Sequence, residues 1–139
     1  MRDIQLPMRI AYIAKLTALG LTVYEMDAVP QNAPTPYVII GEFLSSEISD
    51  KTHFGHKASQ LLDIVTKSPK NKVEGSKEVD LLANQIFGVI NSKAPFIIND
   101  DLQSVNIKII QDKKLNAIVE TDRVYRRLIR FEHTIRQLN

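Results

Sequence analysis

The clearest hydrophobic pattern in the chain lies between residues 76 and 90. Its apolar positions are spaced three and four residues apart, which is typical of one buried face of a helix. Ser76 precedes them and has the side chain of a helix N-cap. The pattern therefore predicts a helix whose buried face consists of Val79, Leu82, Ala83, Ile86, Val89 and Ile90.

A second helix is predicted near the start, over residues 6–19. Pro7 suits its first turn and Gly20 lies just past its end. The same spacing rule predicts a buried face of Leu6, Ile10, Ile13 and either Leu16 or Thr17.

Shorter apolar runs predict strands at residues 21–26, 37–44 and 105–109. Residues 58–66 are a further β-type run, the third in chain order, although their period alone does not separate a strand from the start of a helix. The last segment, 119–136, alternates and is long for its place, and one of its faces is too charged for a core, so we expect it to extend beyond the sheet or meet another chain. One face carries Tyr125, Ile129, Phe131, His133 and Ile135, and the other carries Arg126, Arg130, Glu132 and Arg136.

The order of these elements is helix, three strands, helix, two strands. Consecutive strands with short links favour an antiparallel or mixed sheet. We therefore expect one α+β domain over residues 1–139, with about five strands and two helices packed on one face.

Composition narrows the class of protein. The chain has 139 residues, of which 44% are apolar and 24% charged, as in a globular domain. It has no cysteine, which excludes disulfides and thiolate metal sites. No apolar run suggests a membrane span or a secretory signal, so we expect the protein in the cytoplasm where it is made.

The net charge of +2 is small, but the basic residues are unevenly placed. Five of the seven arginines follow residue 122. Four lysines are expected in one solvated loop between the third strand and the second helix: Lys67, Lys70, Lys72 and Lys77.

Candidate catalytic and metal-binding residues have simpler interpretations. His53 and His56 form H-x-x-H, but no third ligand is evident, so a solvated loop is favoured over a metal site. His133 is expected to be a hydrogen-bonded core or interface histidine. Asp63 is isolated, while Asn99, Asp100 and Asp101 suit a turn.

The serines Ser45, Ser46, Ser49 and Ser59 lack a nucleophile-elbow context, and there is no glycine-rich phosphate loop. We therefore predict no enzyme activity, no cofactor and no metal.

The arginines of the last strand allow two interpretations. They could meet nucleic-acid phosphates nonspecifically, or Arg126 and Arg130 could pair with carboxylates of a neighbouring strand or subunit. The second is favoured because the aromatic platform common in single-strand binders is missing.

Three prolines lie between the first two strands, at Pro30, Pro34 and Pro36. Each fixes φ and removes a backbone donor, so an extended strap is expected there and not a hairpin turn. A polyproline conformation would let residues 28–35 reach roughly 25 Å. The strap could seal a sheet edge or contact a neighbouring subunit.

The stretch VYEMDAVPQNAPTPYVIIGE, residues 23–42, resembles the tail-completion proteins of long-tailed bacteriophages, also called tail terminators or head-to-tail joining proteins. Matching positions are Val23, Tyr24, Val29, Pro30, Ala33, Pro34, Pro36, Tyr37, Val38, Gly41 and Glu42, followed more loosely by Ser49, Asp50, Lys51, Thr52 and Gly55. After residue 95 the resemblance fades.

The resemblance implies a structural protein of the virion that assembles with itself into a ring, typically a hexamer, at the head-proximal end of the tail. Such a ring ends growth of the tail tube and joins the tail to the head connector or stopper protein. Another neck component, stopper or adaptor, is the alternative; a small nucleic-acid-binding module is a more distant one.

Within this hypothesis the loop 45–57 and the strand 119–136 would make subunit or partner contacts. The loop residues concerned are Asp50, Lys51, Thr52, Phe54 and Gly55. Phe54 would anchor a partner or pack back on its own subunit. Arg126, Arg130 and Arg136 would face either the DNA channel or an interface.

Overall fold

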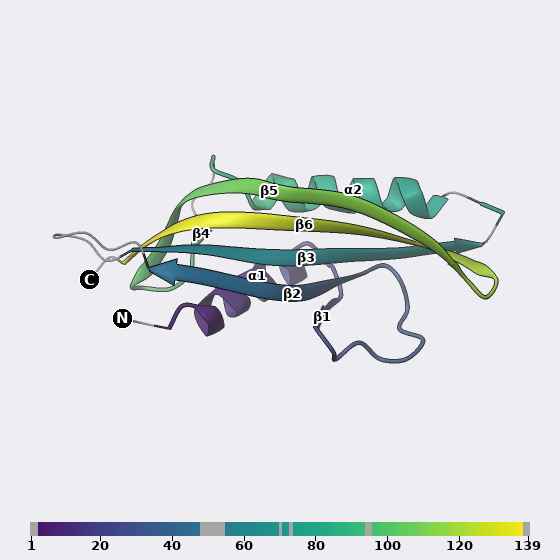
Figure 1. Cartoon of the computed structure of the whole chain (residues 1–139), viewed down its shortest axis with the longest axis horizontal. Coiled ribbons are helices and arrows are strands. Elements are labelled where there is room, and N and C mark those ends of the chain that lie inside the picture. Colours follow the sequence, from purple (N-terminus) through teal and green to yellow (C-terminus); the bar gives the residue numbers. More distant parts are fainter. Residues whose placement is uncertain (1–2, 48–54, 70, 73, 94–95, 138–139) are drawn as a thin grey trace.

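The computed structural model describes residues 3–47, 55–69, 71–72, 74–93 and 96–137 (Figure 1). Two helices and six strands follow one another along the chain: α1 (Gln5–Ala18), β1 (Val23–Glu25), β2 (Tyr37–Glu47), β3 (Gly55–Pro69), α2 (Glu74–Val89), β4 (Phe96–Ile97), β5 (Leu102–Val119) and β6 (Asp122–Gln137).

All six strands form one mixed sheet in the order β1-β2-β3-β6-β5-β4. The predicted α+β class is confirmed, with six strands where about five were expected. The additional strand is the two-residue β4, which lies just after the break predicted at Pro95. β3 and β6 pair along their whole length, from Gly55 opposite Arg136 to Pro69 opposite Asp122. These long strands set the length of the molecule (Figure 1).

β5 is much longer than the sequence predicts. A strand was expected over residues 105–109 only, whereas β5 continues to Val119 and turns into β6 through Glu120, whose φ is +55°. From residue 108 onward every β5 residue is exposed. Because neither face of this half is buried, its sequence lacks the alternation by which a half-buried strand is recognised.

The proline-rich segment connects two parallel strands. β1 pairs with β2 in parallel, Val23 opposite Val38, so the chain must return along the sheet between them. The prediction that this connection is not a hairpin turn is confirmed. It is less extended than expected, because the N–H of Ala33 donates to the carbonyl of Pro30 and both Asp27 and Asn32 have positive φ.

α2 buries the predicted face: Val79, Leu82, Ala83, Ile86 and Ile90 are buried and Val89 is half-buried. The predicted start of this helix was wrong. Glu74 is already helical, so Ser76 lies within the first turn and not at the N-cap. The predicted lysine loop is shorter for the same reason. Lys67 belongs to β3 and Lys77 to α2, while Lys72 lies in the connection and Lys70 lies outside the described residues.

α1 buries a different face from the predicted one. Met8, Ala11, Tyr12 and Leu16 are buried, whereas Leu6 and Ile10 are 48% and 56% exposed. The helix is apolar on two sides, so spacing alone does not select the side that meets the sheet.

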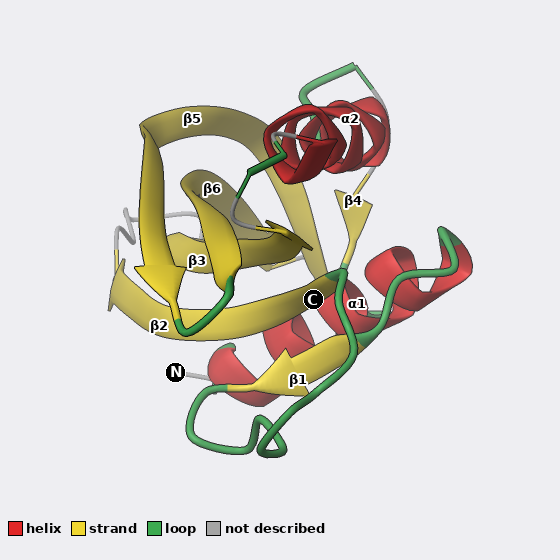
Figure 2. Cartoon of the chain, turned by 90° about the vertical axis from the view of Figure 1, so that its right-hand side faces the viewer, coloured by secondary structure: helices red, strands yellow, loops and turns green. Residues whose placement is uncertain are grey.

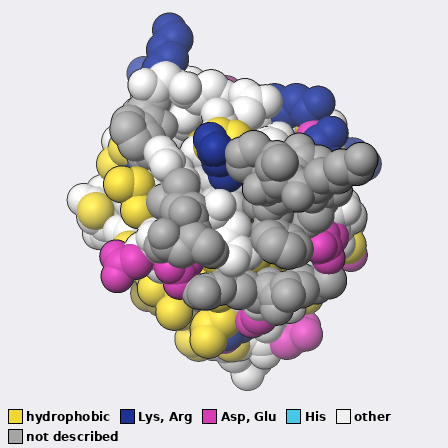
Figure 3. Space-filling model, turned by 90° about the vertical axis from the view of Figure 1, so that its left-hand side faces the viewer, with side chains coloured by type: hydrophobic (Ala, Val, Ile, Leu, Met, Phe, Trp, Pro, Cys, Tyr) yellow, Lys and Arg dark blue, Asp and Glu magenta, His cyan; other side chains and the backbone are white. Residues whose placement is uncertain are grey.

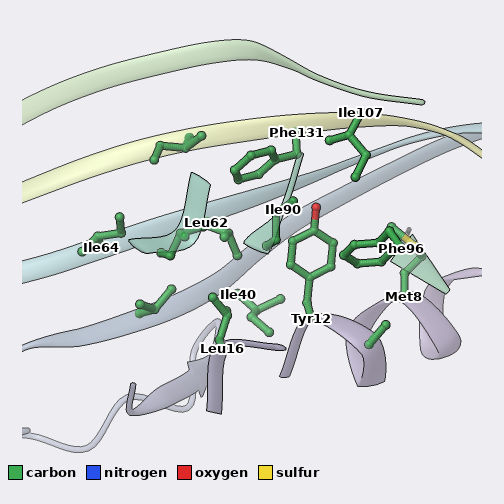
Figure 4. Packing of buried hydrophobic residues seen from close by; sticks show 14 of the residues in the cluster. Met8, Tyr12, Leu16, Ile40, Leu62, Ile64, Ile90, Phe96, Ile107 and Phe131 are labelled. Carbon is green, nitrogen blue, oxygen red and sulfur yellow. The ribbon is translucent and has the colours of Figure 1, made fainter. Parts of the chain in front are cut away.

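Both helices cover the same face of the sheet (Figure 2). Their buried residues form one cluster with the inward residues of β2, β3 and β6, among them Ile40, Leu62 and Phe131 (Figure 4). Tyr12 lies in this cluster with its ring centroid 5.4 Å from that of Phe96. The prediction of two helices on one face is therefore confirmed, and the opposite face of the sheet is left uncovered by helices.

A polar network crosses this core. The hydroxyl of Tyr12 in α1 bonds Nε2 of His133 in β6, and Nδ1 of His133 lies 2.9 Å from Oγ of Ser104 in β5. Oγ of Ser104 donates to the carbonyl of Asn106 at 3.3 Å. A neutral imidazole has one donor and one acceptor. Since the Ser104 hydroxyl donates its hydrogen to the carbonyl of Asn106, it can only accept from His133. Nδ1–H of His133 therefore donates to Ser104, and Nε2 accepts from the Tyr12 hydroxyl.

Burial lowers the pKa of His133 from its usual 6.5 to about 4. The unfolded chain therefore binds a proton between these values that the folded chain does not. Stability is fully present above pH 6.5 and is lost as the pH falls toward 4. We expect the free energy of unfolding to drop by about 2 kcal/mol from pH 7 to pH 5 through this group.

Urea unfolding at several pH values measures this loss. A His133→Gln variant keeps polar atoms at the site without titrating, and its stability should depend less on pH over that range. An equal slope in both proteins would contradict the assignment.

The two glycines of α2 provide a second test. A Cβ on Gly75 would lie 2.7 Å from Cδ2 of the buried Tyr125 ring, whereas a Cβ on Gly88 would meet nothing within 4 Å. Gly75→Ala is expected to destabilise the protein by about 1–3 kcal/mol through overpacking. Gly88→Ala should be neutral or stabilising by up to about 1 kcal/mol.

Thermal unfolding of both variants measures the contrast. Equal effects would show that Gly75 is not required by its contact with Tyr125.

Candidate functional site

The face of the sheet that the helices leave uncovered, named here the outer face, carries the charged side of β6. Alternation along this strand is confirmed. The buried residues are Tyr125, Ile129, Phe131, His133 and Ile135, and the opposite face carries Arg126, Arg130, Glu132 and Arg136.

Arg126 forms an ion pair with Asp63 on the neighbouring strand β3. Both Nε and Nη2 of the guanidinium donate to the carboxylate, which is only 5% exposed. This hydrogen bonding raises the pKa of Arg126 above its ordinary value. Asp63 is therefore not isolated, as the sequence suggested; its partner lies 63 residues away in the chain.

Arg130 reaches across β3 to β2. It donates to Oγ of Ser59 at 2.9 Å and to a carboxylate oxygen of Glu42 at 2.8 Å. Farther along the same face, Glu132 lies within 4.0 Å of Lys57 and 3.4 Å of Lys108. Arg126 and Arg130 thus pair with carboxylates of the same chain, which supports the second of the two interpretations of this strand.

The outer face is hollowed above these pairs. A depression of about 340 Å³ lies over Ser59, Arg130 and Glu132, with Leu44 and Ile110 at its sides. Leu44 belongs to β2 and Ile110 to β5, so the curled sheet brings its two long outer strands around one concave surface.

On the helix-covered face, Arg127 joins α2 to the long hairpin. It donates to Asp112 of β5 at 2.8 Å and to Asp80 of α2 at 3.0 Å, and its guanidinium lies over the Phe87 ring. Lys114 adds a bond to Asp80 at 2.8 Å. Hydrogen bonding to Arg127 lowers the pKa of Asp112. The β5–β6 hairpin is therefore held as far as residue 114.

The residues singled out in the stretch 23–42 lie at the β1–β2 edge of the sheet. Tyr24 and Tyr37 pack edge to face with centroids 5.4 Å apart. Gly41 approaches Leu61 so closely that an added Cβ would lie 3.3 Å from its Cδ2. Val23 and Tyr24 lie in β1, Tyr37, Gly41 and Glu42 lie in β2, and the connection between them holds Val29, Pro30, Ala33, Pro34 and Pro36.

Most of the predicted loop contacts lie outside the described residues, namely Asp50, Lys51, Thr52 and Phe54, together with His53. Gly55 begins β3. His56 follows it in β3 and is only 4% exposed, so its expected solvated loop was wrong. Among the described residues no group of three histidine, aspartate or glutamate side chains could hold a metal ion. Asn99 makes the expected turn, its Oδ1 accepting from the N–H of Asp101 and Leu102.

The sequence reasoning missed an apolar surface on β5. Half of the large apolar side chains exposed in the described residues lie on this one strand: Val105, Ile109, Ile110, Leu115, Ile118 and Val119. β4 pairs with β5 only at Gln103 and Ser104. Ser92 bonds both backbone groups of Ile107. The run LNAIV at residues 115–119 was the sequence signal for this apolar surface, because its apolar residues do not alternate with polar ones and so lie on both faces of the strand.

β2 presents a second edge. β1 pairs with it as far as Ile40, and along residues 41–47 the side of β2 away from β3 has no strand in the described structure. A hollow of about 340 Å³ borders Gly41, Glu42 and Phe43, and Arg9 and Glu25 also line it. Another hollow borders residues 45–47 next to Gln5.

Comparisons with known proteins identify the fold. No family model matches the chain, and no curated protein matches it. A solved chain from the "Virion of native gene transfer agent (GTA) particle" is similar in structure, with a TM-score of 0.58 and 16% identity over 86% of this chain and 84% of that one. A second solved structure, with no function named, gives a TM-score of 0.55 and 12% identity over 93% and 94%. At these identities the similarity shows a shared fold.

No described helix is both long and apolar enough to cross a membrane.

The Asp63–Arg126 pair is testable by substitution. Arg126→Ala leaves a buried carboxylate without its cation and should destabilise the protein by about 1–3 kcal/mol. Arg136→Ala is the matched control on the exposed part of the same face and should change stability by less than about 0.5 kcal/mol. Urea unfolding measures both.

Adding Asp63→Asn to Arg126→Ala should restore part of the loss, because no unpaired charge remains buried. Additive effects of the two changes would contradict the pairing.

Proposed function

We propose that this protein is a structural component of a phage-like virion. In this proposal, copies of the chain form a ring, a hexamer in the related family, at the head-proximal end of the tail. The ring terminates the tail tube and joins the tail to the head connector. The protein is assembled in the host cytoplasm and acts without cofactor or catalysis.

The observation that carries the proposal is the shared fold with a chain of the gene transfer agent virion. The similarity spans most of both chains, so it concerns the whole domain and not one common motif. The motif over residues 23–42 is independent support, since it lies at one edge of the sheet where a neighbouring subunit would meet it.

The surface features are consistent with a subunit that has two different contact faces. One edge of the sheet is apolar along β5, and the other is bordered by hollows along β2. Two unlike surfaces on opposite edges suit head-to-tail contacts, which close into a ring when the rotation between copies is regular.

A neck adaptor or stopper is the second candidate, because the same fold similarity supports it. A nucleic-acid-binding module is less well supported. Arg126 and Arg130, its main candidate contacts, already bond Asp63 and Glu42.

Deletion of the gene in a producing phage or phage-like element tests the proposal. We expect heads that contain DNA, detached tails, and tail tubes of uncontrolled and excessive length, because nothing ends tube growth. Electron microscopy of lysates gives both the tail lengths and the number of joined particles, and complementation in trans is the control.

Detached tails of normal length would favour the neck adaptor or stopper. Normal, infectious particles without the protein would refute a structural role.

A further inference from the structure

We propose that the tip of the β5–β6 hairpin of one copy adds to the β2 edge of a second copy. Residues 113–119 of β5 would lie as an extra antiparallel strand along residues 41–47 of the neighbour. This inference rests on the proposed ring and names the surfaces that form it.

The donor is the outer edge of β5. β5 bonds β6 on one side, and beyond Ser104 no strand of the described structure lies on its other side. The outward backbone groups of an edge strand bond readily to another strand. Leu115, Ile118 and Val119 are 42%, 49% and 54% exposed at this tip, past the last ion pair that holds the hairpin to α2. Burial against a second chain would remove this apolar area from water.

The acceptor is the edge of β2 just past the end of β1. The last bond that covers this edge joins the N–H of Met26 to the carbonyl of Ile40. From Gly41 onward the two hollows beside Gly41–Phe43 and residues 45–47 leave room along the strand. An added strand would therefore follow on from β1 without displacing it.

Direction and length agree. β2, β3, β6 and β5 are each antiparallel to the next, so β5 of a similarly oriented second copy runs antiparallel to β2. With outer-face residues opposed, Ser46 would lie across from Leu115 and Leu44 across from Ala117, and the paired stretch would span about 20 Å at the rise of a strand.

Charge favours this pairing over one between two β5 edges. Residues 3–47 hold five carboxylates and two cations, whereas residues 96–137 hold eight cations and six carboxylates. At the end of the molecule opposite the β5–β6 hairpin tip, Figure 3 shows most of the basic side chains in the upper half and most of the acidic ones in the lower half. Two β5 tips would instead pair segments that each carry Lys113 and Lys114 and no carboxylate.

Carboxylates are available at the acceptor edge. The side chains of Glu25 and Glu42 remain 53% and 57% exposed although each has an arginine partner in its own chain. Lys113 lies on the outer face opposite Leu128, the same face to which Glu42 points. The two side chains would therefore project from the same face of the joined sheets, at opposite ends of the paired stretch.

The absence of cysteine allows a clean cross-linking test. Ser46→Cys is mixed, in the purified protein and in assembled particles, with Leu115→Cys, Ala117→Cys or Val119→Cys. All four positions lie on the outer face, and opposed residues of paired strands are close enough for a disulfide. Asn116→Cys, on the other face, and Asn84→Cys, exposed on α2, are the matched controls.

We expect at least one outer-face pair to form a mixed dimer at least tenfold faster than either control. Ser46→Cys combined with that β5 cysteine in one chain should give a ladder of covalent oligomers. Equal rates for pairs and controls, no cross-linking, or faster bonding between two β5 cysteines would overturn the inference.

The cross-linking experiment and the gene deletion test the edge pairing and the tail role independently. If loss of the gene gives overlong tails but no outer-face pair cross-links, the tail role stands and the edge pairing is wrong. If the pairs cross-link but particles form normally without the protein, the self-association is right and the tail role is wrong.

Discussion

The structure depends on the register between β3 and β6. Fifteen consecutive residue pairs run from one end of the molecule to the other, and this register decides which side chains face the helices. It places Leu62 beside Ile129 in the core and Asp63 next to Arg126 on the outer face. A slip of one residue would exchange the two faces and bury the arginines. The apolar core and the outer ion pairs therefore specify the same alignment from opposite sides.

The two faces of the sheet specify this β3–β6 register through different interactions. On the inner face, both helices close a continuous apolar cluster, which a polar chain crosses from Tyr12 through His133 to Ser104. On the outer face there is no covering layer, and long arginine side chains lie across their neighbours, bonding Asp63, Ser59 and Glu42. The outer face is thus polar but largely self-satisfied, so unpaired surface is concentrated at the sheet edges.

Local periodicity predicted the parts that are amphipathic. The buried face of α2 and the alternation of β6 follow directly from side chains that meet the core on one side. Periodicity failed for two elements. α1 is apolar on two sides but buries only one, and the far half of β5 is exposed on both faces. The pairing of Asp63 with Arg126 and the parallel β1–β2 contact join residues that only the folded sheet brings together, so the sequence carried no local sign of either.

Ser92 limits where any strand can join β5. Its hydroxyl donates to the carbonyl of Ile107 and accepts from the N–H of the same residue. The backbone N–H and carbonyl of Ile107 are therefore not available to another strand, and β4 already pairs with Gln103 and Ser104. A strand added to this edge could not bond the backbone of Ile107, so it could pair only with the part of β5 that follows this residue. Ser92 would thus set a limit on the register of any strand added to β5.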